Sequence, residues 1–153
     1  MAQHHALMTA FIAAGLVLTL QARADAPTSS LATVLVKVKG ARNDLGEVTG
    51  ALWRNCPGFP RDRSGVFVRD VATVKEGEAV LEFKGVPYGT FAATVLHDEN
   101  KSGDADENML GLPLEGFGFS RNPGVMLGAP HFQDASFEVK QAVVNVEIKL
   151  KYL

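Results

Sequence analysis

Cysteine is nearly absent from this sequence, and basic residues are not in excess, which narrows the classes of protein it can belong to. Cys56 is the single cysteine among 153 residues, so an internal disulfide cannot form. Lysine and arginine number 15 against 17 aspartates and glutamates, which gives a formal net charge of −2. A nucleic-acid-binding protein needs a basic surface, so we expect no nucleic-acid partner.

Long apolar runs are also scarce, and the clearest one stands near the N-terminus. The run Ala6–Leu20 is short for a permanent membrane-spanning helix. Ala22 and Ala24 supply the small residues that signal peptidase requires at −3 and −1. We therefore predict a signal peptide over residues 1–24 and an exported protein, periplasmic or secreted, with no membrane span after cleavage. The segment before the run lacks lysine and arginine, so an uncleaved membrane anchor is the alternative.

Helical periodicity is not sustained anywhere after this segment, and the remaining pattern is that of strands. Residues 143–151 alternate apolar and polar side chains, as a strand with one buried face does. Six further segments of strand character are separated by turn residues: 33–39, 46–54, 66–74, 79–85, 89–97 and 135–140. About seven short strands with close turns predict an all-β domain over residues 25–153, an antiparallel β-sandwich.

The most unusual segment is HDENKSGDADENMLG, residues 97–111, which contains five acidic side chains. Calcium binds six to eight oxygens, gathered from alternate residues of a tightly wound loop. Counting from Asp98, the segment matches a good half of the calcium-loop pattern, but position 5 is Ser102 instead of Asp or Asn, and position 12 is Met109 instead of glutamate. Glu107 or Glu115 would have to complete the ligand shell.

This pattern makes calcium the candidate cofactor of the loop. The candidate ligands are Asp98, Asn100, Ser102, Asp104, Asp106 and Glu115. The alternative is a solvated turn, because Asp, Asn, Ser and Gly are also the common turn-forming residues.

His97 ends the predicted strand 89–97 on its inward face. That position suits a hydrogen-bonded core histidine that orients the loop. Together with Asp98 and His131, it would also match a zinc or copper site in residue type. No local motif brings the two histidines together, so the core histidine is the favoured interpretation.

The segment after the loop, LGLPLEGFGFSRNPG at 110–124, is too rich in glycine and proline for a helix. Aromatic side chains on a rigid loop can act as contact anchors for a partner. We therefore name His97, Phe117, Phe119 and Asn122 as a candidate binding surface. The alternative is that the two phenylalanines fold back and cover the core.

Several segments together resemble a family of small exported bacterial proteins known only as a domain of unknown function. They are GARNDLG (40–46), VPYGTFAATVL (86–96), HDENKSGDADENMLGLPLEGFGFSRN (97–122) and GAPHFQDASFEV (128–139). The resemblance implies a prealbumin-like or carboxypeptidase-regulatory-like (Ig-like) sandwich, and it implies no activity or substrate. His131 departs from the family pattern, which more usually has a small or hydroxyl residue there.

Two functions from different classes follow from these observations. The first is an exported, non-catalytic module whose loop, ordered by calcium at 98–106, presents the binding surface to an envelope protein, peptide or glycan. The second is a metal-dependent or acid/base hydrolytic enzyme with its site in the 97–115 loop, built from His97, Asp98, Glu99 and Glu115. The sequence shows no nucleophile–base pair and no complete set of metal ligands, so the non-catalytic module is favoured.

Overall fold

The structure, a computed structural model, describes residues 31–55, 57–103, 105, 113–125 and 128–153. The predicted signal peptide with Ala22 and Ala24 therefore lies outside the described residues, as do Cys56, Asp104 and Asp106. Within the described ranges, no helix is long and apolar enough to cross a membrane.

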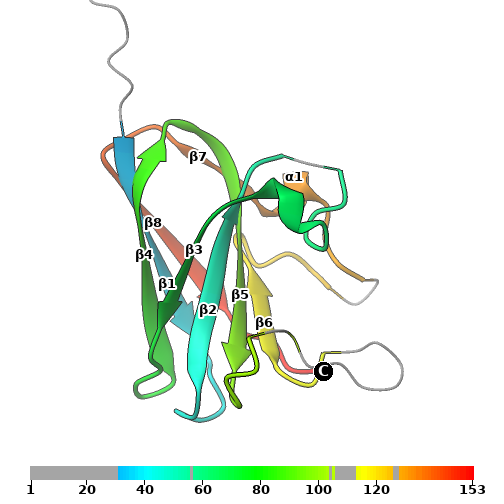
Figure 1. Ribbon diagram of the computed structural model, residues 1–153. Helices are drawn as coiled ribbons and strands as arrows, with labels where there is room; N and C mark the ends of the chain where they lie inside the picture. The colour runs from blue at the N-terminus through cyan, green and yellow to red at the C-terminus, as the bar shows by residue number, and fades with distance from the viewer. Residues whose placement is uncertain (1–30, 56, 104, 106–112, 126–127) are drawn as a thin grey trace, which may run out of the picture.

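Within these described residues, eight strands form two sheets that face each other, as Figure 1 shows. The elements in chain order are β1 (Leu31–Lys39), β2 (Glu47–Trp53), the 3-10 turn η1 (Arg63–Gly65), β3 (Val66–Ala72), β4 (Glu78–Pro87), β5 (Gly89–Asp98), β6 (Gly116–Phe119), α1 (Phe132–Ala135), β7 (Ser136–Val139) and β8 (Val143–Lys149). One sheet has the order β4-β1-β8 and the other β3-β2-β5-β6, with β7 also paired to β5. The prediction of an all-β protein is confirmed, and the two sheets are consistent with a sandwich.

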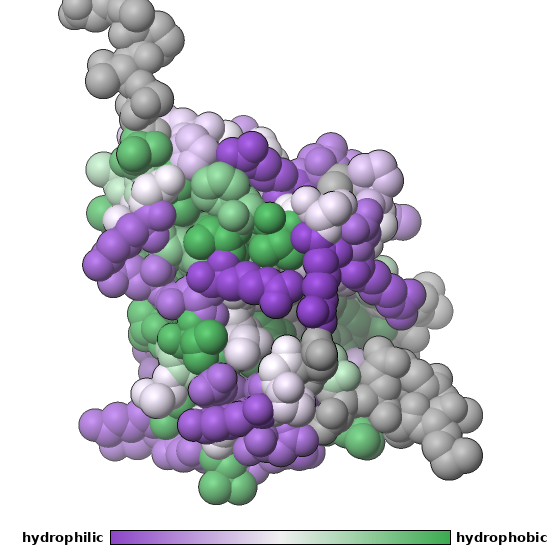
Figure 2. All heavy atoms as spheres, in the orientation of Figure 1, coloured by the Kyte–Doolittle hydropathy of each residue, from purple (hydrophilic) through white to green (hydrophobic). Residues whose placement is uncertain are grey.

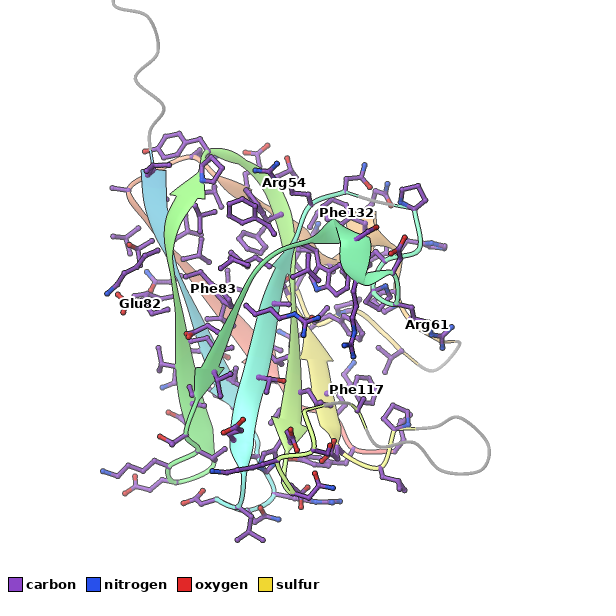
Figure 3. All side chains as sticks on the ribbon, viewed as in Figure 1. Arg54, Arg61, Glu82, Phe83, Phe117 and Phe132 are labelled. Atoms are coloured by element: carbon purple, nitrogen blue, oxygen red, sulfur yellow. The ribbon has the colours of Figure 1, made fainter. Side chains whose placement is uncertain are left out.

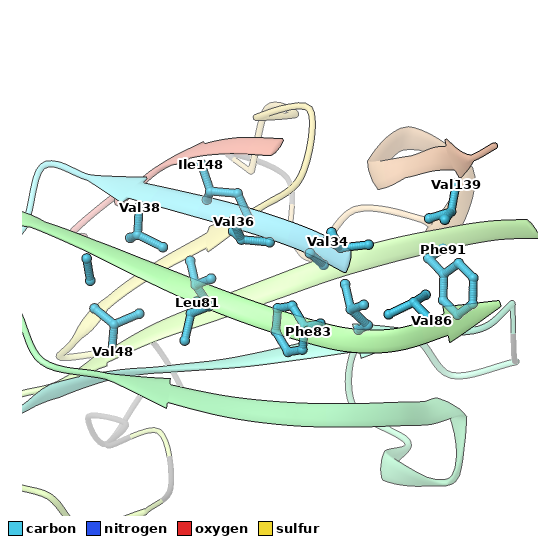
Figure 4. Close-up of a cluster of buried hydrophobic side chains, with 14 of the residues drawn as sticks. Val34, Val36, Val38, Val48, Leu81, Phe83, Val86, Phe91, Val139 and Ile148 are labelled. Carbon is cyan, nitrogen blue, oxygen red and sulfur yellow. The ribbon is translucent and has the colours of Figure 1, made fainter. Parts of the chain in front are cut away.

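Alternation of side chains builds the core between the sheets. In β1, the inward side chains of Val34, Val36 and Val38 are completely buried. They lie beside Leu81 and Phe83 of β4 in the same sheet and pack against buried side chains of the other sheet. Figure 4 shows this cluster between the two layers. The buried apolar stripe of each strand is the reason that the sheets pack face to face.

The prediction that all strands run antiparallel is wrong for one pair. Strand β8 lies parallel to β1, with Val146 opposite Val36. Parallel neighbours need a long crossover connection, and here almost the whole chain, through both sheets, separates the two strands. The alternation within 143–151 is the same for either direction, so the sequence pattern did not distinguish them.

Strand β6 is an eighth strand where we expected a loop. Its residues alternate glycine and phenylalanine, and Gly116 and Gly118 point inward. A Cβ on Gly116 would lie 2.4 Å from Cζ of Tyr152, and one on Gly118 would lie 2.5 Å from Cγ2 of Ile148. Glycine in a strand often marks such a close approach. The glycines therefore make room for Tyr152 and Ile148 instead of ending the strand.

Asn122 covers part of the free edge of β8. Its backbone is left-handed, with φ 50°. The side-chain Nδ2 donates to the carbonyl of Glu147 at 3.1 Å, and Oδ1 accepts from the backbone N–H of Lys149 at 2.7 Å. The amide thus takes the place of a neighbouring strand, which protects an otherwise open edge. The structure places this member of the candidate binding surface against β8.

Candidate functional site

His97 stands at the end of β5 with its side chain in the interior, fully shielded from solvent. Its Nε2 lies 2.8 Å from the carbonyl oxygen of Leu45, which can only accept, so Nε2 carries a proton. In the neutral ring, Nδ1 then accepts from the hydroxyl of Tyr152, at 2.7 Å. Both ring nitrogens are thus engaged with the protein, which is the arrangement of a core histidine.

Tyr152 connects this histidine to the segment before β2. Its oxygen accepts from the backbone N–H of Arg42 at 3.1 Å, and the Arg42 guanidinium lies 4.8 Å from its ring centre. Burial raises the pKa of Tyr152, the Arg42 N–H opposes this, and the charge of Glu99 adds to it. The net pKa lies above the ordinary value of 10.0, so the hydroxyl keeps the proton that it donates to His97.

Glu99 ties two of the segments that the sequence singled out, 40–46 and 97–111. Its Oε1 lies 2.7 Å from Nε of Arg42, and its Oε2 accepts from Nδ2 of Asn43 at 3.0 Å. Burial raises the pKa of Glu99, but the bonds from Asn43 and Arg42 and the Arg42 charge outweigh it. The net pKa is below the ordinary 4.5. Glu99 is therefore an ionised partner in a structural network.

Gly46 brings the same two segments into direct contact. It has φ 67°, and a Cβ there would lie 1.9 Å from the carbonyl oxygen of Asp98. A side chain at this position would collide with rigid backbone, and the left-handed conformation itself favours glycine. GARNDLG and the start of the acidic loop are thus one packed unit.

The carboxylate of Asp98 is buried and organises the loop that follows it. Its Oδ1 accepts from the backbone N–H of Ser102 at 3.0 Å, and its Oδ2 from that of Gly103 at 2.8 Å. Oδ1 of Asn100 also accepts from Ser102, at 2.9 Å. Glu115, itself buried, accepts from the backbone N–H of Glu99 at 3.1 Å. The chain therefore winds tightly around the Asp98 carboxylate.

Four of the six candidate calcium ligands are thus described, and Asp104 and Asp106 are not. In the part of the chain that the structure describes, no group of three or more His, Cys, Asp or Glu side chains is arranged to hold a metal ion. His131 precedes α1, and the following strand β7 pairs with the beginning of β5. His97 lies at the far end of β5, so the two histidines are not brought together.

A second feature was not predicted from the sequence: a hollow of about 440 Å³ on the outer face of the five-stranded sheet. Cross-strand register explains it. Arg69, Ala51, Thr94 and Phe119 lie side by side in one row across β3, β2, β5 and β6. The next row is Val71, Thr49, Leu96 and Phe117. In the first row, the small side chains of Ala51 and Thr94 lie between the larger Arg69 and Phe119, and Thr49 lies beside Ala51, which leaves the space open.

Phe117 and Phe119 form one wall of this hollow. Phe119 is 9% exposed and belongs to a second apolar cluster, with Trp53 and Phe132, outside the main core. In Figure 3, Phe83 lies between the sheets, whereas Phe117 and Phe132 lie on the other side of the five-stranded sheet. The phenylalanines therefore neither project freely nor cover the main core, but line a cavity.

The hollow is separate from the acidic network. Among the residues that the structure places, the lining includes Thr49, Thr94 and Trp53, but none of His97, Asp98, Glu99 or Glu115. The sequence held one indication of it. Segment 46–54 has the apolar residues Ala51 and Trp53 on its outward side, so that side also had to be covered.

Residues 36–147 match the family described as an uncharacterized protein conserved in bacteria (DUF2141). The chain belongs to this family. The resemblance to an uncharacterised bacterial family is thereby confirmed. No curated protein and no solved structure matches the chain. Membership of this family carries no activity with it, so the function has to be argued from the site.

Proposed function

We propose that this protein is an exported, non-catalytic β-sandwich module that binds its ligand in the hollow on the outer face of the five-stranded sheet. The observation that carries the proposal is the hollow itself, about 440 Å³ in volume, between β3 and β6. Sites for small molecules usually span about 300–1,000 Å³ and are apolar, with a few polar groups that orient the ligand.

The lining matches this description. Phe117, Phe119 and Leu96 supply apolar surface, and Thr49 and Thr94 supply hydroxyls on the floor. The floor belongs to the central strands of the sheet, which are hydrogen-bonded on both sides and therefore rigid. A preformed site on rigid strands loses little entropy when a ligand binds.

The arrangement of the acidic residues supports a non-catalytic role over the hydrolytic alternative. His97 is held by Leu45 and Tyr152, and Glu99 by Arg42 and Asn43. A general acid or base must reach the proton that it transfers in a bound substrate. These side chains are directed into the protein, which favours structural roles.

We also propose that the loop at 98–106 is ordered by calcium. Support comes from the chain between Asp98 and Gly103, which wraps around a buried carboxylate and has left-handed backbone at Lys101 and Gly103. Each Asp98 oxygen accepts one backbone N–H and retains a second lone pair for a cation. Such a loop would border the hollow, because Gly103 and Ala105 lie on its rim.

We further propose that the sandwich is prealbumin-like or carboxypeptidase-regulatory-like, and that the protein reaches the periplasm or the medium after cleavage behind Ala24. The two sheets and the N-terminal apolar run support these proposals. An experimental structure and the N-terminal sequence of the exported protein would test them.

The binding proposal is tested by NMR with ¹⁵N-labelled protein and a set of small apolar and aromatic fragments. We expect binders at about millimolar Kd, with shifts gathered on the amides of Thr49, Ala51, Thr94 and Leu96. Thr49→Leu fills the floor and should abolish the shifts. Thr33→Leu, the same change on an outward position of β1, should leave them intact. Fragments that bind elsewhere, or bind Thr49→Leu equally well, would contradict the proposal.

A further inference from the structure

The hollow is chemically asymmetric, with aromatic side chains at one end and a cationic side chain at the other. Phe119 and Arg69 occupy the two ends of one row, separated by Ala51 and Thr94. Three strand spacings of about 4.8 Å place the ends of this row about 14 Å apart. This length accommodates a ring and a short chain lying across the sheet.

Arg69 is available for a ligand. It is exposed, and among the described residues its guanidinium makes no hydrogen bond or ion pair, whereas its backbone pairs with Ala51 of β2. The neighbouring carboxylate of Asp70 accepts from the backbone N–H of Glu82 at 2.7 Å. Glu47, on the rim, lies 3.8 Å from Nζ of Lys101. Among the described residues of the lining, both acids are thus engaged with other groups. The visible face in Figure 2 carries a band of hydrophilic side chains over β3 and β2.

The floor also provides hydrogen-bond donors. The oxygen of Thr94 accepts from Nε1 of Trp53 at 2.8 Å, so its hydroxyl hydrogen remains to donate to an acceptor in the hollow. Thr49 adds a second hydroxyl in the next row. Arg63 lies on the rim as a second basic residue. Hydrogen-bond donors and positive charge, with no free carboxylate among the described lining residues, are the complement of an anion.

We propose, building on the function proposed above, that the hollow binds a small carboxylic acid with an aromatic or aliphatic body. The body packs against Phe117 and Phe119 over the small residues of the floor. The carboxylate reaches the guanidinium of Arg69, whose planar donors match two carboxylate oxygens. A single negative charge suits the hollow, because the Glu47–Lys101 pair contributes no net charge to its rim. A sugar would need more polar partners than the two floor hydroxyls supply.

The test compares three acids with their neutral amides: 4-phenylbutyrate, indole-3-acetate and decanoate. Binding to the full protein is followed by NMR shifts and by calorimetry. At least one acid should shift the amides of Ala51 and Thr94 and bind about tenfold or more tighter than its amide. Arg69→Gln should reduce the affinity for that acid to the level of the amide and leave amide binding unchanged. Lys84→Gln, the same charge change on the outer face of the other sheet, should have no effect.

The outcomes separate this inference from the proposed function. If acid and amide bind equally in the hollow, or if Arg69→Gln has no effect on the acid, the carboxylate inference is overturned and the binding module stands. If none of the acids shifts the floor amides, the inference is overturned as well. Should the fragment set also fail there, the proposed function fails with it. If a peptide with a free carboxyl terminus binds tightly and no small acid binds, the inference is overturned and the ligand of the hollow is a peptide.

Discussion

The side chains of His97 and Tyr152 share a hydrogen bond of 2.7 Å, although 55 positions separate them in the sequence. The bond joins the end of a central strand to the last residues of the chain. Arg42 extends it, through its backbone N–H on the Tyr152 oxygen and its guanidinium against the ring. The beginning of the acidic loop is thus fixed by residues from three distant parts of the sequence.

Removing the Tyr152 hydroxyl should destabilise the protein. Tyr152→Phe leaves Nδ1 of His97 buried without its donor, which costs about 1–3 kcal/mol in the free energy of unfolding. Urea unfolding measures the change. Tyr88→Phe is the control, because Tyr88 is 43% exposed and its substitution should stay within about 0.5 kcal/mol. Equal effects of the two substitutions would show that the hydrogen bond with His97 contributes nothing.

The stability should fall in acid through Glu99. Its pKa in the folded protein is below the ordinary 4.5, so it stabilises the fold above pH 4.5. This contribution is lost as the pH falls through the folded pKa. Glu99→Gln should therefore be less stable than wild type near neutral pH, and the difference should shrink in acid. Arg42→Gln should weaken the same dependence. A difference that stays constant with pH would contradict this role of Glu99.

Filling the inner side of β6 should be costly. Gly116→Ala places a Cβ 2.4 Å from Cζ of Tyr152, so the ring must move away from His97. Overpacking of this kind costs about 1–3 kcal/mol. Gly124→Ala is the matched control, because no described residue lies within 4 Å of a Cβ there. Thermal unfolding of the two variants tests the prediction, which fails if Gly116→Ala unfolds at the wild-type temperature.

Calcium should raise the melting temperature if it orders the loop. A ligand at a hundredfold excess over its Kd stabilises the folded state by about 2.7 kcal/mol, which calorimetry detects easily. Asp106→Asn should weaken the response. Asp134→Asn should preserve it, because the Asp134 carboxylate accepts from the backbone N–H of His131 at the start of α1. Terbium luminescence gives an independent readout. A melting temperature unmoved by millimolar calcium, together with no terbium signal, rules the site out.

Much of the fold could be predicted because alternation is a local property. Valines at every second position place β1 and β8 with one side inward, and the same rule places His97 on the inward side of β5. Turn residues marked where most strands end. These features depend on neighbours in sequence, so they can be read without knowledge of strand pairing.

The site itself depended on pairing, which local patterns do not contain. The hollow exists because Arg69, Ala51, Thr94 and Phe119 fall in one register across four strands. A shift of one residue in any strand would turn its side chains to the other face. Likewise, the sequence pattern did not predict β6 because its inward residues are glycines, and only the folded chain shows Tyr152 against Gly116 and Ile148 against Gly118.

The sequence by itself determined the all-β class, the inward position of His97 and the membership of an uncharacterised bacterial family. The tertiary structure decided that β8 runs parallel to β1. It also decided that the segment GARNDLG (40–46) packs on the beginning of the acidic loop. It also decided that the open cavity lies on the outer face of the sheet and is not lined by Asp98, Glu99 or Glu115. The physical reason is distance along the chain: His97 meets Leu45 across 52 positions, and only the folded chain brings such residues into contact.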